Sequence, residues 1–252
     1  FVLIPDGAAD EPQESLGGKT PLAAASTPML QWLAERGTVG LTNHVPDSLP
    51  PGSEVACMSL LGYDPLKYFT GRAPLEAAAK SISLGPLDWA VRCNLVSIED
   101  SGDGPTMVDF TADHITTEEA TALLESVQEG LQADFPSLQG WRFVPGVSYR
   151  NLLLYQTDQE MKCELGEDLR TTAPHDRINQ QIADSFPRGT GSKLLTDIMA
   201  RSELWLKNHP VNEVRKSKGL GLATHIWLWG AGQRPAFKPF QSLHGVDGVM
   251  IT

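Results

Sequence analysis

Ser53 has the sequence setting of a nucleophile. It follows a Pro51-Gly52 turn and precedes a helix-forming run, Ala56–Leu61. A glycine lets the backbone bend sharply, so the next residue can begin a helix at the positive end of its dipole. An alkoxide, a phosphate or a metal-bound oxygen is electrostatically favoured there. Because a serine that only caps a helix gives the same pattern, the motif alone leaves both interpretations open.

Asp6 is the second candidate. It ends an apolar run, Phe1–Ile4, and precedes the turn glycine Gly7. The run predicts a buried strand, and ligands of α/β folds bind beyond the carboxyl ends of strands. A carboxylate is a hard oxygen ligand for a divalent cation. A plain Asp-Gly turn is the alternative.

His175 and Asp176 form a third candidate, in a stretch that predicts an irregular loop. A histidine beside a carboxylate can move protons or bind a substrate, and it can also simply cap a helix. Arg215 lies near the expected end of a helix, where a cation also complements the dipole. Arg72, after a turn glycine, is interpreted as structural, and the tryptophans of 225–230 as packing.

The elements that must position these residues follow from local patterns. Helices are predicted at 27–37, 53–61, 116–131 and 191–208. Strands are predicted at 1–4, 38–42, 89–98, 141–144, 151–155, 225–230 and 246–251. Residues 89–155 have an α+β pattern, unlike the strand-helix alternation before them.

Composition limits the class of protein. The chain has 252 residues and 41% hydrophobic content, enough for one large α/β domain or two smaller ones. A net charge of −11 gives no electrostatic footprint for nucleic acid and no basic attraction to a membrane, so any phosphate must be held by a few local cations. No apolar run approaches the roughly 20 residues of a membrane helix, and no signal peptide is recognised.

Three widely separated cysteines, Cys57, Cys93 and Cys163, lack CxxC spacing. This pattern favours a reduced compartment, so we expect a cytoplasmic protein. Both chain ends resemble interrupted buried strands, from which we expect that the sequence is part of a longer polypeptide.

Several motifs occur together in one order. They are Pro5-Asp6-Gly7, Gly18–Leu22, Pro51-Gly52-Ser53, Ser59–Pro65, Thr70-Gly71-Arg72, Val91–Asn94, Pro174-His175-Asp176 and His209–Asn212 with Arg215. Together they resemble the cofactor-independent phosphoglycerate mutases of the archaeal type, in the alkaline phosphatase superfamily. Glu54 and Ala73 depart from the pattern, which usually has aspartate and glycine there.

The resemblance implies an α/β fold with an alkaline-phosphatase-like core, a mostly parallel sheet flanked by helices, and an inserted α+β lid. We expect the first part of the core at 1–87, the lid at 88–218 and a truncated return to the core at 219–252. The C-terminal part of the core, with further aspartate and histidine ligands, is expected beyond residue 252.

The resemblance also implies an isomerase of glycolysis and gluconeogenesis that interconverts 3- and 2-phosphoglycerate through phosphoserine, without 2,3-bisphosphoglycerate. Ser53 would accept the phosphoryl group and, with Asp6, bind one of two divalent ions, Mn²⁺ or Mg²⁺. Substrate contacts are expected from Arg92, Asn94, His175, Asp176 and Arg215. A small phosphorylated substrate is the expected partner, with no nucleic acid or membrane.

Four alternatives remain open at the level of sequence. Two keep the Ser53 chemistry: a metal-dependent phosphatase, or another phosphomutase of the same superfamily. The others are a non-catalytic relative and a plain α/β binding protein.

Overall fold

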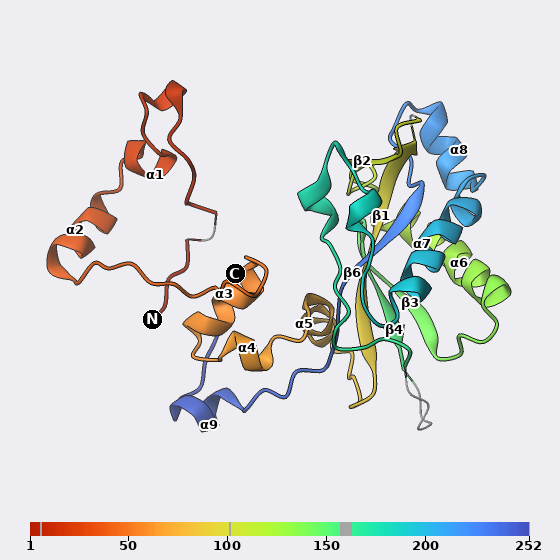
Figure 1. Ribbon diagram of the computed structural model, residues 1–252. Helices are drawn as coiled ribbons and strands as arrows, with labels where there is room; N and C mark the ends of the chain where they lie inside the picture. Colours follow the sequence, from red (N-terminus) through yellow and green to blue (C-terminus); the bar gives the residue numbers. More distant parts are fainter. Residues whose placement is uncertain (6, 101, 157–162, 252) are drawn as a thin grey trace. The chain divides into compact units, whose positions relative to one another are not determined.

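The computed structural model describes residues 1–5, 7–100, 102–156 and 163–251. The chain divides into two compact units, Phe1–Lys67 and Tyr68–Thr252, which we describe separately (Figure 1). No helix in the described ranges combines the length and the apolar character needed to cross a bilayer.

The first unit contains short helices joined by long loops. The helices are η1 (Glu14–Leu16), α1 (Pro21–Ala24), α2 (Pro28–Arg36) and α3 (Ser53–Leu60), and α4 (Pro65–Tyr68) follows. The helix predicted at 27–37 is confirmed as α2, because Pro28 occupies its first turn and Gly37 its C-cap. Likewise, the helix predicted after the Pro-Gly turn is confirmed as α3.

The strands predicted at 1–4, 38–42 and 246–251 do not form in the described residues. Phe1 and Leu3 are fully or almost fully exposed, as are Val249 and Ile251. A strand acquires its backbone hydrogen bonds from a neighbouring strand, and the described residues provide none beside these segments. Local apolar character was therefore not sufficient, and the three predictions are wrong for this structure.

The second unit is built around a six-stranded sheet with the order β3-β4-β1-β2-β5, with β6 also paired to β1. The strands are β1 (Trp89–Asp100), β2 (Pro105–Asp109), β3 (Trp141–Val147), β4 (Arg150–Tyr155), β5 (Gln180–Gln181) and β6 (His225–Gln233). The strands predicted at 89–98, 141–144, 151–155 and 225–230 are thus confirmed.

Every strand pair described in this sheet is antiparallel, so the mostly parallel sheet that we expected is not observed. The reason is visible in the connections. Strands β3 and β4 are joined by a tight turn at Ser148 and Tyr149, and so short a connection permits only antiparallel pairing. The fold of the described residues is mixed α/β with an antiparallel sheet.

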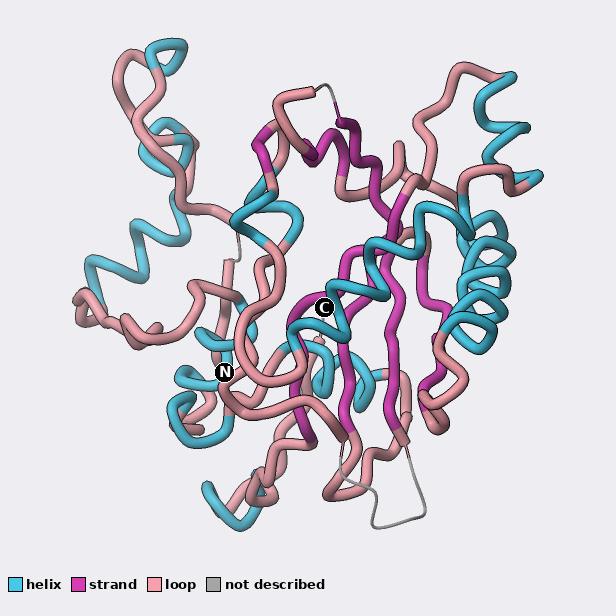
Figure 2. The backbone as a smooth tube through the Cα atoms, turned by 45° about the vertical axis from the view of Figure 1, so that its right-hand side comes forward, coloured by secondary structure: helices cyan, strands magenta, loops and turns pink. Residues whose placement is uncertain are grey.

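Helices cover both faces of this sheet (Figure 2). Helix α5 (Arg72–Ala79) packs on one face, and α6 (Thr117–Asp134) and α7 (Ser192–Leu206) pack on the other. The unit also contains α8 (Pro210–Ser217), α9 (Phe240–His244) and the short turns η2 (Pro174–Arg177) and η3 (Ala183–Ser185). On β4, Leu153 packs into the core under α6 and α7, whereas Leu152 and Leu154 pack with α5. This alternation is the period of two that places successive side chains on opposite faces.

The sheet extends beyond the lid range that we expected at 88–218. Strand β6 pairs along β1 from Val96, opposite His225, to Trp89, opposite Gln233. Helix α5, which precedes residue 88, packs on β1 and β6. Segments on both sides of residues 88–218 therefore pack with this sheet, and the expected division into core and lid stays a prediction.

The Thr70-Gly71 turn lies directly against the backbone of β6. Gly71 has a φ of +146°, and a Cβ atom there would lie 2.3 Å from the Ala231 carbonyl oxygen. The Thr70 hydroxyl donates to the Gln233 carbonyl at 2.5 Å. Only a glycine allows this approach, which fixes the start of α5 on the sheet.

We expect Gly71→Ala to lower the free energy of unfolding by about 2–4 kcal/mol, because it adds a collision to a strained dihedral. Urea denaturation of the variant and the wild type measures this free energy. Gly219→Ala is the control, since Gly219 has a φ of +69° but no atom within 4 Å of an added Cβ. It should lose only about 1–2 kcal/mol. Equal losses in both variants would contradict the close packing.

Candidate active site

Ser53 lies on a hollow of about 350 Å³ in the first unit. It is the first residue of α3, and Gly52 is the N-cap. The alternative in which Ser53 caps the helix is therefore not what the structure has. Its position in the first turn keeps Ser53 within the positive end of the α3 dipole.

Asp6 lies outside the described residues, so its role as a metal ligand stays a prediction. Its neighbours Pro5 and Gly7 line the hollow with Ser53. His44 also lines the hollow, a residue that the sequence did not mark. The Ser59 hydroxyl donates to the His44 carbonyl at 2.6 Å, which fastens this loop to α3.

Two of the three cysteine thiols, Cys93 and Cys163, are poor nucleophiles, whereas Cys57 lines the hollow with Ser53. All three cysteines are free. Burial raises the pKa of Cys93 far above its usual range and that of Cys163 to about 11. Neither thiol forms an appreciable fraction of thiolate at neutral pH, and thiolate is the reactive form.

In the second unit, Arg92 is a nearly buried cation in the middle of β1. Its side chain is 5% exposed, and its Nε donates to Glu76 Oε2 at 2.9 Å. Its guanidinium carbon lies 4.1 Å from the ring centroid of Trp229. Within the described ranges, its two terminal nitrogens make no hydrogen bond, so they present donors to an incoming anion.

Glu76 also pairs with Arg72, whose Nε lies 3.2 Å from Oε1. One carboxylate thus serves two guanidinium groups from α5 and β1. Burial lowers the pKa of Arg92, and the positive charges of Arg72 and Arg150 add to this, while Glu76 opposes it. An arginine remains protonated at neutral pH even so, and the group keeps a net positive charge.

Asn94 and His175 meet the same tryptophan. Asn94 Oδ1 accepts from Trp229 Nε1 at 3.0 Å, and its Nδ2 donates to the Phe110 carbonyl at 3.1 Å. The His175 ring centroid lies 5.3 Å from that of Trp229. His175 is 43% exposed, and Asp176 lies beside it with 3.7 Å between Nε2 and Oδ1. The structure therefore brings Arg92, Asn94 and His175 together around Trp229.

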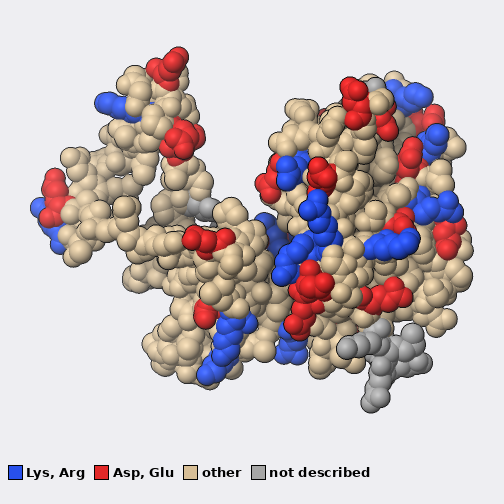
Figure 3. All heavy atoms as spheres, in the orientation of Figure 1, with Lys and Arg blue, Asp and Glu red and all other residues tan. Residues whose placement is uncertain are grey.

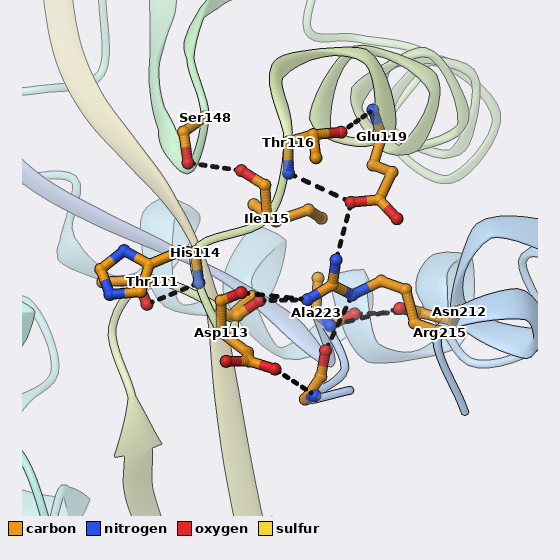
Figure 4. Close-up of polar contacts among 12 residues, drawn as sticks. Thr111, Asp113, His114, Ile115, Thr116, Glu119, Ser148, Asn212, Arg215 and Ala223 are labelled. Carbon is orange, nitrogen blue, oxygen red and sulfur yellow. Dashed lines mark hydrogen bonds and ion pairs between the residues drawn. The ribbon is translucent and has the colours of Figure 1, made fainter. Parts of the chain in front are cut away.

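Arg215 belongs to a different network, on α8 (Figure 4). It donates from Nε to the Gly221 carbonyl at 2.8 Å, from NH1 to Glu119 at 2.7 Å and from NH2 to the Ala112 carbonyl at 2.7 Å. The residue is 2% exposed. Its donors are used within the protein, and it shares no partner with the group around Trp229. Its predicted contact with substrate stays untested.

Three residues near Arg92, which are Glu76, Arg72 and Trp229, were not predicted as site residues from the sequence. Glu76 was not marked, although the Arg72-to-Glu76 spacing of four residues is the signal of a helical ion pair. Arg72 was interpreted as a structural residue and Trp229 as packing. Only the pairing of β6 with β1 places Trp229 opposite Arg92, and no local pattern predicts that register.

No set of three or more His, Cys, Asp or Glu side chains that could hold a metal occurs in the part of the chain that the structure describes. The described lining of the hollow includes Ser53 and His44 but no carboxylate, and Mg²⁺ is usually bound through one or two carboxylates. The described residues alone do not fit a metal centre.

Charge on the visible surface of the sheet-bearing unit is mixed, with basic and acidic side chains interspersed (Figure 3). The protein as a whole carries a net charge of −11. Affinity for an anion therefore has to come from a local group such as Arg92 with Arg72, and it is not a property of the whole surface.

Comparison with known proteins decides the family. A family model described as 2,3-bisphosphoglycerate-independent phosphoglycerate mutase matches residues 34–212, more than half of the chain. The chain belongs to this family. A mutase of that name from Methanothrix thermoacetophila is 43% identical over 251 residues, and a probable mutase from Geobacter sulfurreducens is 41% identical over 252.

The matches cover the whole of this chain but only 59% and 60% of those two mutases. The solved structure of a cofactor-independent phosphoglycerate mutase from Thermoplasma acidophilum aligns over 94% of this chain and 59% of its own, with a TM-score of 0.50 and 26% identity. A Pyrococcus horikoshii structure aligns with a TM-score of 0.59 at 22% identity, covering 94% of this chain and 52% of its own, which supports the fold alone. The family resemblance drawn from the motifs is confirmed.

The Arg215 network predicts an acid-sensitive contribution to stability. Burial raises the pKa of Glu119, but the Thr116 backbone bond and the Arg215 charge outweigh it and hold that pKa below its ordinary value of 4.5. A lowered pKa in the folded state stabilises the protein above that ordinary value, and this stabilisation is lost as the pH falls below it.

We expect Glu119→Gln to lower the free energy of unfolding at pH 7 by about 1–2 kcal/mol, because the buried Arg215 loses its charged partner. The difference from the wild type should shrink as the pH falls below 4.5 and through the lowered pKa of Glu119, where its carboxylate becomes protonated. Urea denaturation at several pH values tests this. Glu118→Gln, in the same turn but exposed, should change stability by less than about 0.5 kcal/mol. A pH-independent difference would contradict the assignment.

Proposed function

We propose that the whole protein interconverts 3-phosphoglycerate and 2-phosphoglycerate without 2,3-bisphosphoglycerate. The observation that supports this most directly is the match of this entire chain to the named mutases, at 43% identity for that of Methanothrix thermoacetophila. The chain includes Ser53 at the start of α3, on a hollow, as a phosphoryl acceptor requires.

In this proposal Ser53 carries the phosphoryl group between the two hydroxyls of glycerate. The Ser53 oxygen attacks phosphorus, the bond from phosphorus to the substrate oxygen breaks, and the serine proton ends on the glycerate hydroxyl. The second half reverses this at the neighbouring hydroxyl, so no group is gained or lost. The positive end of the α3 dipole favours the charge that develops at Ser53.

Arg92 binds an anionic group of the substrate. Its Nε is held by Glu76, and its two terminal nitrogens make no hydrogen bond within the described ranges. A guanidinium can grip a carboxylate or phosphate through two parallel hydrogen bonds, and low exposure strengthens them. His175 is half-exposed and contacts the same Trp229 ring as Arg92, and we place it there to exchange a proton with a glycerate hydroxyl, with Asp176 next to it.

Asn94 and Arg215 act indirectly in this proposal. The side-chain oxygen of Asn94 accepts from Trp229, and its side-chain nitrogen donates to the Phe110 carbonyl. In this proposal Asn94 therefore orients Trp229. Arg215 joins α6 to α8 through Glu119 and fixes the frame of the sheet-bearing unit. The proposal does not require either residue to touch the substrate.

Divalent ions, Mn²⁺ or Mg²⁺, held in part by Asp6 and Ser53, belong to the proposal through the family resemblance. Such ions, when bound, neutralise charge on the phosphoryl oxygens. Because the described residues alone do not provide a metal site, the steps above use only the side chains of this chain. An alkaline-phosphatase-like core with an inserted lid at 88–218, and a cytoplasmic location, complete the proposal.

We expect Ser53→Ala in the full-length protein to reduce the interconversion rate at least about 10³-fold, because no other group replaces the acceptor. The assay follows 3-phosphoglycerate conversion without added 2,3-bisphosphoglycerate, and mass spectrometry of protein quenched in turnover locates the phosphate. Ser48→Ala, on the exposed loop before Ser53, should keep full activity. Release of inorganic phosphate in place of 2-phosphoglycerate would indicate a phosphatase and refute the proposal.

We expect Arg92→Lys to raise KM for 3-phosphoglycerate by about tenfold or more, since an ammonium cannot bond Glu76 and grip an anion through a planar fork. Steady-state kinetics measures this. Arg188→Lys is the control, because Arg188 is 71% exposed and outside the group. An unchanged KM in Arg92→Lys would remove Arg92 from the binding site.

A further inference from the structure

We infer that Trp229 is the positioning residue of the anion-binding group, fixing Arg92 and His175 for the phosphorylated substrate. The inference rests on the proposed function and assigns a role to a residue that sequence reasoning treated as packing. Trp229 is 6% exposed, so it acts through its neighbours and not by touching the substrate.

Three polar residues converge on this one side chain. The guanidinium carbon of Arg92 lies 4.1 Å from the ring centroid, within cation–π range. The indole Nε1 donates to Asn94 Oδ1 at 3.0 Å, and the His175 ring packs at 5.3 Å between centroids. The indole thus contacts Arg92 through its ring face, Asn94 through its N–H group and His175 through a ring–ring contact.

A tryptophan that serves only as packing has different surroundings. Trp141, on β3 of the same sheet, is also 6% exposed. Its ring packs on Tyr155 at 5.3 Å between centroids, and none of the cation–π contacts among the described residues involves it. Equal burial therefore does not explain the polar contacts of Trp229, and Trp141 provides a matched control.

The strand that carries Trp229, β6, also holds the loop that leads to His175. The Gly230 N–H donates to Thr171 Oγ1 at 2.8 Å, and the Trp227 indole donates to the Thr172 carbonyl at 2.8 Å. Both contacts lie a few residues before His175. Movement of β6 or of its tryptophan would therefore displace the loop that carries the histidine.

Gly230 lies on this strand beside both arginines, and its backbone conformation favours glycine. Its φ is +61°, and an added Cβ would lie 3.4 Å from Arg72 Cβ and 3.5 Å from Arg92 Cδ. Arg72 lies 5.9 Å from the Trp229 ring centroid. With Glu76 between the two arginines, the indole supplies the second constraint on the direction of the Arg92 terminal nitrogens.

The test compares Trp229→Phe, Trp229→Leu and Trp141→Phe in the full-length protein. Phenylalanine keeps a ring for Arg92 and His175 but loses the bond to Asn94, whereas leucine loses all three. Equilibrium binding of 3-phosphoglycerate is measured by calorimetry, because it does not depend on turnover. Turnover gives KM and kcat, and thermal unfolding shows whether each variant is folded.

We expect 3-phosphoglycerate to bind about 3–10-fold more weakly to Trp229→Phe and about 10–100-fold more weakly to Trp229→Leu. KM should rise more than kcat falls. Trp141→Phe should bind as the wild type does, even with a similar loss of thermal stability. This graded loss, partly rescued by the aromatic substitution, is not the signature of general destabilisation.

Wild-type affinity in folded Trp229→Leu would overturn the inference, and so would equal losses in Trp229→Leu and Trp141→Phe. A wild-type protein that binds no 3-phosphoglycerate would also overturn it. Failure of the proposed function has a different signature: the wild type binds 3-phosphoglycerate but does not convert it, while the order of affinities among the tryptophan variants is unchanged.

Discussion

The sheet-bearing unit depends on the burial of one positive charge. Arg92 projects from the central strand with 5% of its side chain exposed, and a buried ion without partners costs several kcal/mol. Glu76 and Trp229 offset this cost from two other elements, α5 and β6. Retaining the charge therefore requires these three elements to keep their positions relative to one another. The residues that we propose to bind an anion thus also constrain the fold.

Local signals predicted most of the second unit. Helix α6 begins with a capping box, in which Thr116 and Glu119 bond each other's backbone N–H groups, and its start was correctly predicted. Strands β1, β3 and β4 followed from dense apolar runs. The parallel sheet was expected from the family resemblance, and strand direction depends on which strands pair, which the apolar pattern of one strand does not encode.

The candidate site likewise contains residues that local motifs indicate and residues that only the tertiary structure brings close. Motifs brought out Ser53, Arg92 and His175 because each stands in a short string with a characteristic order. The residues that hold them are distant in sequence: Trp229 lies 137 positions after Arg92, opposite it only through strand pairing. For Arg215, a motif indicated a contact with substrate. In the structure, its hydrogen bonds go to Glu119 and to backbone carbonyls.

The contact between Gly71 and Ala231 has a practical consequence for dividing this chain. The turn before α5 and the last part of β6 fit together with no room for a side chain between them. An engineer who transplants the sheet to another scaffold must carry the stretch from Tyr68 and the stretch to Gln233 along with the intervening strands. A cut at residue 88 would remove Glu76, the counter-ion of Arg92. A cut at residue 218 would remove β6 and leave an open edge along β1.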